Sequence, residues 1–329
     1  MLIAGIDEAG YGPLLGPLVI TGVSMKIPDE LEGLSLWELF SDAISRNTKQ
    51  NKGKFIVADS KKLFRKSSKR NGICELERSA LGITILAEKE TDRKTQFCPE
   101  NLNAFLKLIS LEPECNLQDK WYARSTLKLP VEVDRQGLML AVNIFERELR
   151  AVSAEIAGVY TVPLIERQYN RFAKLMKNKA QILFSQTARI IARIISQSNE
   201  RRIRIFIDKQ GGRNSYTNNL LKFFSQWQLR ILKESDEQSV YVLANNNRAI
   251  EISFTKNGEQ YNLLTAWASI VSKYVRELFM IQFNNYWLGL DKRLKPTAGY
   301  WQDGQRFVRD ILPLMKRMNI KEDELIRQL

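Results

Sequence analysis

Apolar strands that end in carboxylates constrain this chain more than any other feature of its sequence. The run Leu2–Ile6 predicts a buried strand, and the adjacent acids Asp7 and Glu8 follow it directly. A Gly-Tyr-Gly turn comes next, and the apolar residues 14–23 predict a second strand that pairs back on the first. Adjacent carboxylates at a strand end repel each other and raise each other's pKa unless a cation lies between them.

Two later strands end in the same way. Arg and Ile alternate over residues 201–208, which predicts a strand in the centre of a sheet that ends at Asp208. A second alternating run, residues 249–255, leads into a turn that carries Glu259. Ligands gather beyond the carboxyl ends of strands in open α/β sheets, and hard oxygen ligands suit Mg²⁺ or Mn²⁺. The alternative for each acid alone is a cap or turn residue.

The order of the expected elements predicts an α/β fold. Short apolar runs at 54–58 and 82–88 predict strands, whereas residues 35–46, 164–198 and 263–283 have helical spacing. Strands that alternate with helices are typical of this class. Residues 92–135 are polar, contain three prolines and show no sustained period. We therefore predict a single domain over residues 1–329, with residues 92–160 as an insertion within it.

Charge and composition narrow the chemistry. Lys and Arg number 50 against 37 Asp and Glu, a formal charge of +13. This surplus favours a polyanionic partner such as nucleic acid, although a generally basic surface is the alternative. Histidine is absent, which excludes Ser-His and Cys-His nucleophilic catalysis and every histidine-ligated zinc site. Any hydrolysis must therefore depend on carboxylates, lysines or a metal ion.

The expected location is the cytoplasm. Cys74, Cys98 and Cys115 form no close pair and have no metal-type spacing, which fits a reducing compartment. No stretch reaches about 18 consecutive apolar residues, so no membrane span is expected. The first residues also lack the basic segment of a signal peptide. The sequence leaves the oligomeric state open.

Three further stretches carry groups that can hold phosphate. In "DSKKL", residues 59–63, these groups are Ser60, Lys61 and Lys62; the alternative is a helix start capped by Asp59. "GGR", residues 211–213, offers bare backbone and Arg213, or is a plain turn. Residues 293–307 mix basic and aromatic side chains that could stack on bases, or form a surface loop packed by its own aromatic residues.

Taken together, these motifs resemble the type 2 ribonuclease H family, ribonucleases HII and HIII. "GIDEAGYGPLLGP" resembles the family's GIDEAGRGPLAGP, and "DSKKL" matches as it stands. "WASIVSKYVRE", residues 267–277, resembles AASILAKVTRD, and "AGYWQ", residues 298–302, is similar to a weakened KGYGT. The motifs follow the family order from residue 5 to about residue 302 and leave the stretches between them, residues 92–160 above all, uncovered.

The resemblance implies a ribonuclease H-like sheet and hydrolysis of RNA in RNA–DNA hybrids, or of ribonucleotides in duplex DNA, with two divalent ions, Mg²⁺ or Mn²⁺. By motif, Asp7 and Glu8 match the first two metal-binding acids and Asp208 the third. Glu259 lies ten residues before the serine of the third motif and matches the fourth. A Glu at that place is similar to the HIII branch.

The resemblance also implies substrate contacts, from Gly10, Tyr11, Gly12, Ser60, Lys61, Lys62, Arg213, Lys273 and Tyr300. Tyr11 departs from the family, which has Arg or Lys between the two glycines. Tyr300 matches the tyrosine that senses an RNA–DNA junction, but its neighbours differ. Two alternatives therefore stay open: a nuclease of this fold with another nucleic-acid substrate, and a nucleic-acid binding protein without catalysis.

Overall fold

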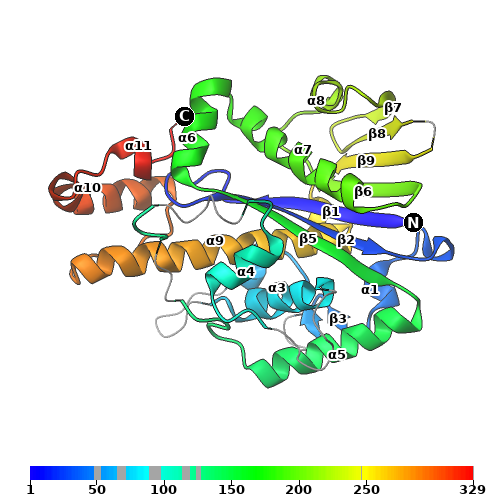
Figure 1. Cartoon of the computed structure of the whole chain (residues 1–329), viewed down its shortest axis with the longest axis horizontal. Helices are drawn as coiled ribbons and strands as arrows, with labels where there is room; N and C mark the ends of the chain where they lie inside the picture. The colour runs from blue at the N-terminus through cyan, green and yellow to red at the C-terminus, as the bar shows by residue number, and fades with distance from the viewer. Residues whose placement is uncertain are drawn as a thin grey trace.

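A mixed seven-stranded sheet with helices on both faces forms the centre of the molecule (Figure 1). The structure is a computed structural model, and it describes residues 1–47, 53–64, 72–88, 98–112, 119–123, 127–245 and 247–328. Cys115 and residues 92–97 of the predicted insertion lie outside the described residues. The predicted α/β class, a mixed sheet flanked by helices, is confirmed.

The strand order places three strands with acidic ends beside one another. From edge to edge the strands are β5 (Glu155–Leu164), β2 (Leu18–Lys26), β1 (Leu2–Ala9), β6 (Arg202–Asp208), β9 (Ala249–Thr255), β8 (Gln238–Ala244) and β7 (Gln228–Glu234). The neighbours β1, β6 and β9 run parallel, and all other neighbours in this seven-stranded sheet are antiparallel. The carboxyl ends of β1, β6 and β9 therefore meet at one edge of the sheet.

Helices cover the sheet in two layers with separate apolar cores. One core packs under α9 (Leu263–Leu290), and its other main helices are α3 (Cys74–Ala87), α4 (Leu102–Ile109), α5 (Arg135–Ala151) and α10 (Trp301–Arg317). The opposite core lies under α6 (Glu166–Met176), α7 (Lys179–Gln197) and α8 (Thr217–Phe223). The remaining short elements are η1 (Asp29–Leu31), α1 (Leu36–Leu39), the parallel pair β3 (Ile44–Ser45) and β4 (Phe55–Ile56), α2 (Ser60–Leu63), η3 (Gly258–Gln260) and α11 (Glu322–Leu325).

A glycine in β1 lets α9 approach the sheet closely. A Cβ built on Gly5 would lie 2.0 Å from the backbone nitrogen of Thr265, near the start of α9. The side chain of Asn262 caps this helix by accepting hydrogen bonds from the backbone N–H groups of Leu264 and Thr265, both at 3.0 Å. The first turns of α9 are thereby held against the strand that carries Asp7.

Most of the predicted elements are found. β1, the central β6 and β9 match their predicted ranges closely, and α9 extends the predicted helix 263–283 to Leu290. The antiparallel β2 is found, but it begins four residues after the start of the predicted range 14–23 and ends three residues beyond it. The helix-rich stretch 164–198 contains α6 and α7. The two-residue strand β4 lies within the run 54–58.

Two predictions of local structure are wrong. Residues 82–88, predicted as a strand, form the end of α3, where a Cβ on Gly82 would lie 2.3 Å from the Phe55 ring. Of the predicted helix 35–46, only α1 is helical, and the chain then enters β3. Of the two alternatives for residues 293–307, the surface loop extends only to Tyr300, because α10 begins at Trp301, and the contact with nucleic acid stays a prediction. Short apolar runs do not distinguish buried helix from strand, which explains the first error.

The predicted domain division is not tested by these elements. β5 begins within the predicted insertion and pairs along the whole of β2, while α4 and α5 pack in the same core as α9. One domain with an insertion at 92–160 stays a prediction. Among the described helices, none is both long and apolar enough to cross a membrane. The cytoplasmic location also stays a prediction.

Candidate active site

The four predicted acids lie at the shared edge where β1, β6 and β9 end. Asp7 and Glu8 directly precede the last residue of β1, and Asp208 is the last residue of β6. Glu259 lies in η3, shortly after the end of β9. The backbone N–H of Gly258 donates a 2.7 Å hydrogen bond to Asp208 Oδ1, which joins the β9 turn to the end of β6. Strand order thus brings together acids that are far apart in the sequence.

The pKa values of the first two acids show how strongly the four carboxylates interact. Burial raises the pKa of Asp7 well above its usual range, and the charges of Glu8 and Asp208 raise it further. The pKa of Glu8 rises to about 8, first through burial and then through the charges of Asp208 and Glu259, while Lys61 opposes this rise. Protons or a bound cation therefore stabilise this edge of the sheet.

The other two acids are less buried, but their pKa values are also raised. Burial raises the pKa of Asp208, and backbone hydrogen bonds from Gly258 and Lys209 act against that rise. Burial also raises the pKa of Glu259, followed by the charges of Asp59 and Asp208. Four carboxyl groups with raised pKa values in one place mark a candidate functional site, because structural ion pairs shift carboxyl pKa values in the opposite direction.

Serine side chains of α9 support the acids, and the sequence analysis did not single them out. Ser269 Oγ donates a 3.2 Å hydrogen bond to Glu259 Oε2. Ser272 Oγ donates to the backbone carbonyl of Asp7 at 3.1 Å. Their spacing within "WASIVSKYVRE" was the available signal. Ser60, predicted to contact substrate, is buried and shares a 3.1 Å hydrogen bond with Ser269 Oγ. In this structure Ser60 therefore braces the serine that holds Glu259.

The donor set fits a hard divalent cation in its chemistry. Carboxylate oxygens are the ligands that Mg²⁺ and Mn²⁺ prefer, and Glu8 Oε2 is buried without a hydrogen-bond partner. A cation would satisfy that oxygen and lower the mutual repulsion of the acids. Among the residues that the structure describes, no three Asp, Glu, His or Cys side chains are gathered closely enough to hold one ion. The charges of the four acids therefore influence one another, but their carboxylate groups do not converge on a single point.

The glycine turn after Glu8 is fixed by its surroundings. Gly10 has φ +84°, and a Cβ there would lie 2.5 Å from the carbonyl oxygen of Pro17 and 2.7 Å from Arg276 Nε. A Cβ on Gly12 would meet nothing within 4 Å, so the backbone at Gly12 is open to an approaching molecule. Gly299 fixes the segment that follows the turn. Its carbonyl oxygen accepts hydrogen bonds from the backbone N–H groups of residues 14 and 15, at 2.8 and 3.1 Å.

Arg276 is another residue that the sequence analysis missed. Its side chain is 1% exposed and donates to the carbonyl oxygens of Leu15 (3.3 Å) and Ala298 (3.0 Å). Its guanidinium lies 5.6 Å from the centre of the Tyr300 ring. Arg276 therefore links the glycine turn to the segment before α10. It lies within the motif that resembles AASILAKVTRD, and that position was the only signal.

The lysines and the tyrosine that are predicted to contact the substrate differ in how exposed they are. Lys61 and Lys62 are exposed in α2, and Lys61 is close enough to lower the pKa values of Glu8, Asp208 and Glu259. Lys273 is instead enclosed: its Nζ lies 2.5 Å from Glu277 Oε1 and 4.3 Å from the Phe64 ring centre. Tyr300 is 53% exposed, which leaves part of its ring available.

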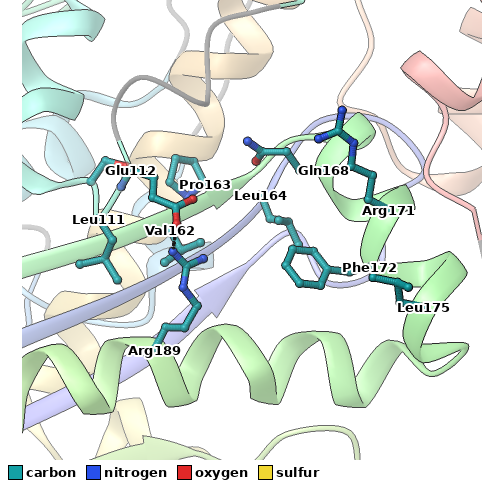
Figure 2. A pocket seen from close by; sticks show the side chains of 11 residues that line it. Leu111, Glu112, Val162, Pro163, Leu164, Gln168, Arg171, Phe172, Leu175 and Arg189 are labelled. Atoms are coloured by element: carbon teal, nitrogen blue, oxygen red, sulfur yellow. Dashed lines mark hydrogen bonds and ion pairs between the residues drawn. The ribbon is translucent and has the colours of Figure 1, made fainter.

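Two hollows of the surface differ in their relation to the acids. One, of about 370 Å³, adjoins the site, since Gly258, Lys256 and the exposed Tyr261 line it. The other, of about 390 Å³, lies against the edge strand β5 between α6 and α7. Figure 2 shows its apolar wall around Phe172 and Arg189 from α7 at its margin. None of the four acids lines it, so it is not the candidate active site.

Comparison with known proteins finds similarity at the level of structure. No protein-family model matches the chain, and no curated protein matches it in sequence. The solved structures that it resembles include type 2 ribonucleases H. The ribonuclease HII of the PCNA:RNase HII complex from Archaeoglobus fulgidus has a TM-score of 0.44 and 14% identity, and the match covers 100% of this chain and 94% of that one.

Two further structures give similar values. Bst ribonuclease HIII in complex with Mn²⁺ has a TM-score of 0.43 and 14% identity; the match covers 100% of this chain and 66% of that one. Ribonuclease H2 from Pyrococcus horikoshii OT3 has a TM-score of 0.43 and 12% identity, with 99% and 92% covered.

Proposed function

We propose that this protein is a metal-dependent nuclease that hydrolyses RNA in RNA–DNA hybrids or ribonucleotides in duplex DNA. The observation that carries the proposal is the meeting of Asp7, Glu8, Asp208 and Glu259 at one sheet edge, beside a glycine turn with exposed backbone. All four carboxyl groups have raised pKa values, so the edge favours a cation in place of protons.

The four acids are the residues that would hold Mg²⁺ or Mn²⁺. Such ions, when bound, supply an activated water and neutralise charge on the phosphate oxygens. The chain itself does the positioning. Ser269 fixes one oxygen of Glu259, and the backbone of Gly258 fixes one oxygen of Asp208. Each of these acids keeps a second carboxylate oxygen free of those bonds to accept a cation or a water proton.

The glycine turn supports the choice of a ribonucleotide substrate. Because nothing fills the space beside Gly12, its backbone can come within hydrogen-bond distance of a sugar. A 2′-hydroxyl both donates and accepts hydrogen bonds, and it distinguishes RNA from DNA at such a contact. Lys61 and the overall charge of +13 favour the polyanionic backbone of a nucleic acid. Contacts from Lys62, Arg213, Lys273 and Tyr300 remain part of the same prediction.

Two alternatives rest on specific observations. Tyr11 between the glycines favours a nuclease of this fold that acts on another nucleic acid, since the turn itself has no cation. The net charge of +13 and the missing cation of the glycine turn favour a nucleic-acid binding protein without catalysis. Substrate choice tests the first alternative, and metal uptake tests the second.

The test of the proposal is a cleavage assay with matched substrates. Labelled RNA–DNA hybrid, DNA duplex with a single ribonucleotide and all-DNA duplex are incubated with Mg²⁺, with Mn²⁺ or with EDTA. We expect metal-dependent cleavage of the first two and at least a hundredfold loss in Asp7→Asn. Asp42→Asn is the control, because Asp42 is exposed on the turn after α1 and makes the same change of charge. Equal cleavage by Asp7→Asn and wild type would refute the proposal.

Metal titration by calorimetry separates an enzyme from a binding protein. Wild type should take up Mn²⁺ in a carboxylate-dependent way, and Asp7→Asn should take up less. If wild type binds hybrid but takes up no metal and cleaves nothing, the protein is a binder without catalysis. If it cleaves all-DNA duplex as fast as hybrid, the proposed substrate is wrong and the alternative nuclease stands.

A further inference from the structure

A lysine from another part of the chain lies over the residue that replaces the expected cation of the glycine turn. Lys179 is the first residue of α7, and its Nζ lies 4.8 Å from the centre of the Tyr11 ring. Both side chains are half-buried. The contact is a cation–π interaction, which holds the ammonium group at the turn without neutralising its charge.

Arg213 reaches the same place from the loop after β6. A Cβ on Gly211 would lie 3.3 Å from Ala180 Cβ and 3.7 Å from the Tyr11 hydroxyl, so this loop, the start of α7 and the turn converge. The charge of Arg213 and that of Glu8 both act on the pKa of Tyr11, which burial raises. Arg213 therefore lies in electrostatic reach of the Tyr11 hydroxyl, and its guanidinium lies 5.6 Å from the centre of the Tyr216 ring.

No carboxylate of the described residues forms an ion pair with either cation. Within the described ranges, no salt bridge involves Lys179 or Arg213, and Arg213 Nη1 is buried without a hydrogen-bond partner. Lys273, by contrast, is paired with Glu277 at 2.5 Å. A charged group that is buried away from water normally has a partner, so the unpartnered Arg213 Nη1 and the lysine held over Tyr11 leave room for an external anion.

We propose that Lys179 and Arg213 bind a backbone phosphate of a nucleic-acid strand that crosses the Tyr11 ring beside the acids. The inference rests on the proposed nuclease function and names the residues that direct its substrate. Lys179 supplies a point charge, and Arg213 offers paired N–H donors for two phosphate oxygens. Tyr11 serves as the platform on which the lysine is held, and its exposed part faces the sugar or base of the strand.

The test measures binding separately from cleavage. Affinity for a fluorescent RNA–DNA hybrid is measured over a range of salt concentrations, in an Asp7→Asn background with Mg²⁺ so that the probe stays intact. Lys179→Met keeps the apolar stem and removes the charge. Lys177→Met is the matched control, because Lys177 is exposed only two residues away and makes the same change of charge. Lys179→Arg restores the charge.

The expected result is a roughly tenfold weaker affinity for Lys179→Met and a salt slope shallower by roughly one, with normal values for Lys177→Met and recovery in Lys179→Arg. Combining Lys179→Met with Arg213→Met should lower the slope by roughly two. Equal losses in Lys179→Met and Lys177→Met would show a general charge effect and overturn the inference. Unchanged affinity in Lys179→Met would mean that the lysine only packs on Tyr11, which also overturns it.

Failure of the inference and failure of the proposed function give different results. If wild type cleaves hybrid with metal while Lys179→Met binds normally, only the phosphate site is wrong. If wild type cleaves nothing but the Lys179-dependent slope is present, the phosphate site stands and the nuclease proposal falls. If no variant binds hybrid at all, both fall.

Discussion

Replacing Glu166 with Gln should remove one distinct part of the pH dependence of this protein's stability. Glu166 is the first residue of α6 and is fully buried. Its Oε1 accepts hydrogen bonds from the backbone N–H of Gly16 at 2.8 Å and from the Tyr122 hydroxyl at 3.1 Å. The carboxyl group therefore ties the end of the glycine turn to the core beneath it, and the amide oxygen of Gln can accept the same bonds.

Burial raises the pKa of Glu166 from its ordinary value of 4.5 to about 7, although the hydrogen bond from Gly16 opposes the rise. Between these two pH values the folded state holds a proton that the unfolded state has lost. Stability contributed by Glu166 is therefore fully present below pH 4.5 and is lost as the pH rises through 7. Full ionisation costs about 3 kcal/mol of unfolding free energy.

The assay is urea unfolding of wild type and Glu166→Gln between pH 4.5 and 8.5, without divalent metal. The acids of the candidate site also have raised pKa values, so wild type alone cannot isolate one group. The difference between the two proteins does isolate it, and Glu166→Gln should gain about 3 kcal/mol relative to wild type across this range. Parallel stability curves would refute the reasoning that burial controls this carboxyl group.

Three other perturbations test the packing, the support and the charge of the site. Gly5→Ala should lower the free energy of unfolding by about 3 kcal/mol, because its Cβ would meet the backbone of α9. Gly289→Ala, with open space around it, should raise the free energy of unfolding by about 0.5 kcal/mol. Thermal unfolding compares the two variants, and equal effects would contradict the close approach of α9 to Gly5. Ser269→Ala should lower kcat on hybrid about tenfold with little change in KM, since Glu259 loses its hydrogen bond; an unchanged kcat would exclude this support. At pH 8 without metal, Asp7→Asn should be more stable than wild type, because burial opposes the ionised Asp7, and destabilisation by Asp7→Asn would contradict the raised pKa of Asp7. Mn²⁺ should raise the melting temperature of wild type more than that of Asp7→Asn.

Local patterns allowed much of the fold to be predicted. β1, β6 and β9 alternate or run apolar over five to eight residues, and α7 and α9 keep one apolar face, so their type follows from period alone. The four acids were found in the same way, since each follows such a strand. Residues 82–88 were misread because a buried helix end with β-branched residues has no period that separates it from a strand. β7 and β8 were missed, and most of β7 is exposed without a buried face.

Only the tertiary structure decided what surrounds the acids. The parallel pairing of β1, β6 and β9 sets Asp7 and Asp208 at one edge, and no local pattern encodes strand order. Burial, which raises their pKa values, depends on α9 packing over Gly5. Tertiary packing also decides what surrounds the turn at Gly10 and its neighbour Tyr11. The sequence shows that the expected cation is missing there, and only the packing of α7 against the turn brings Lys179 over the ring.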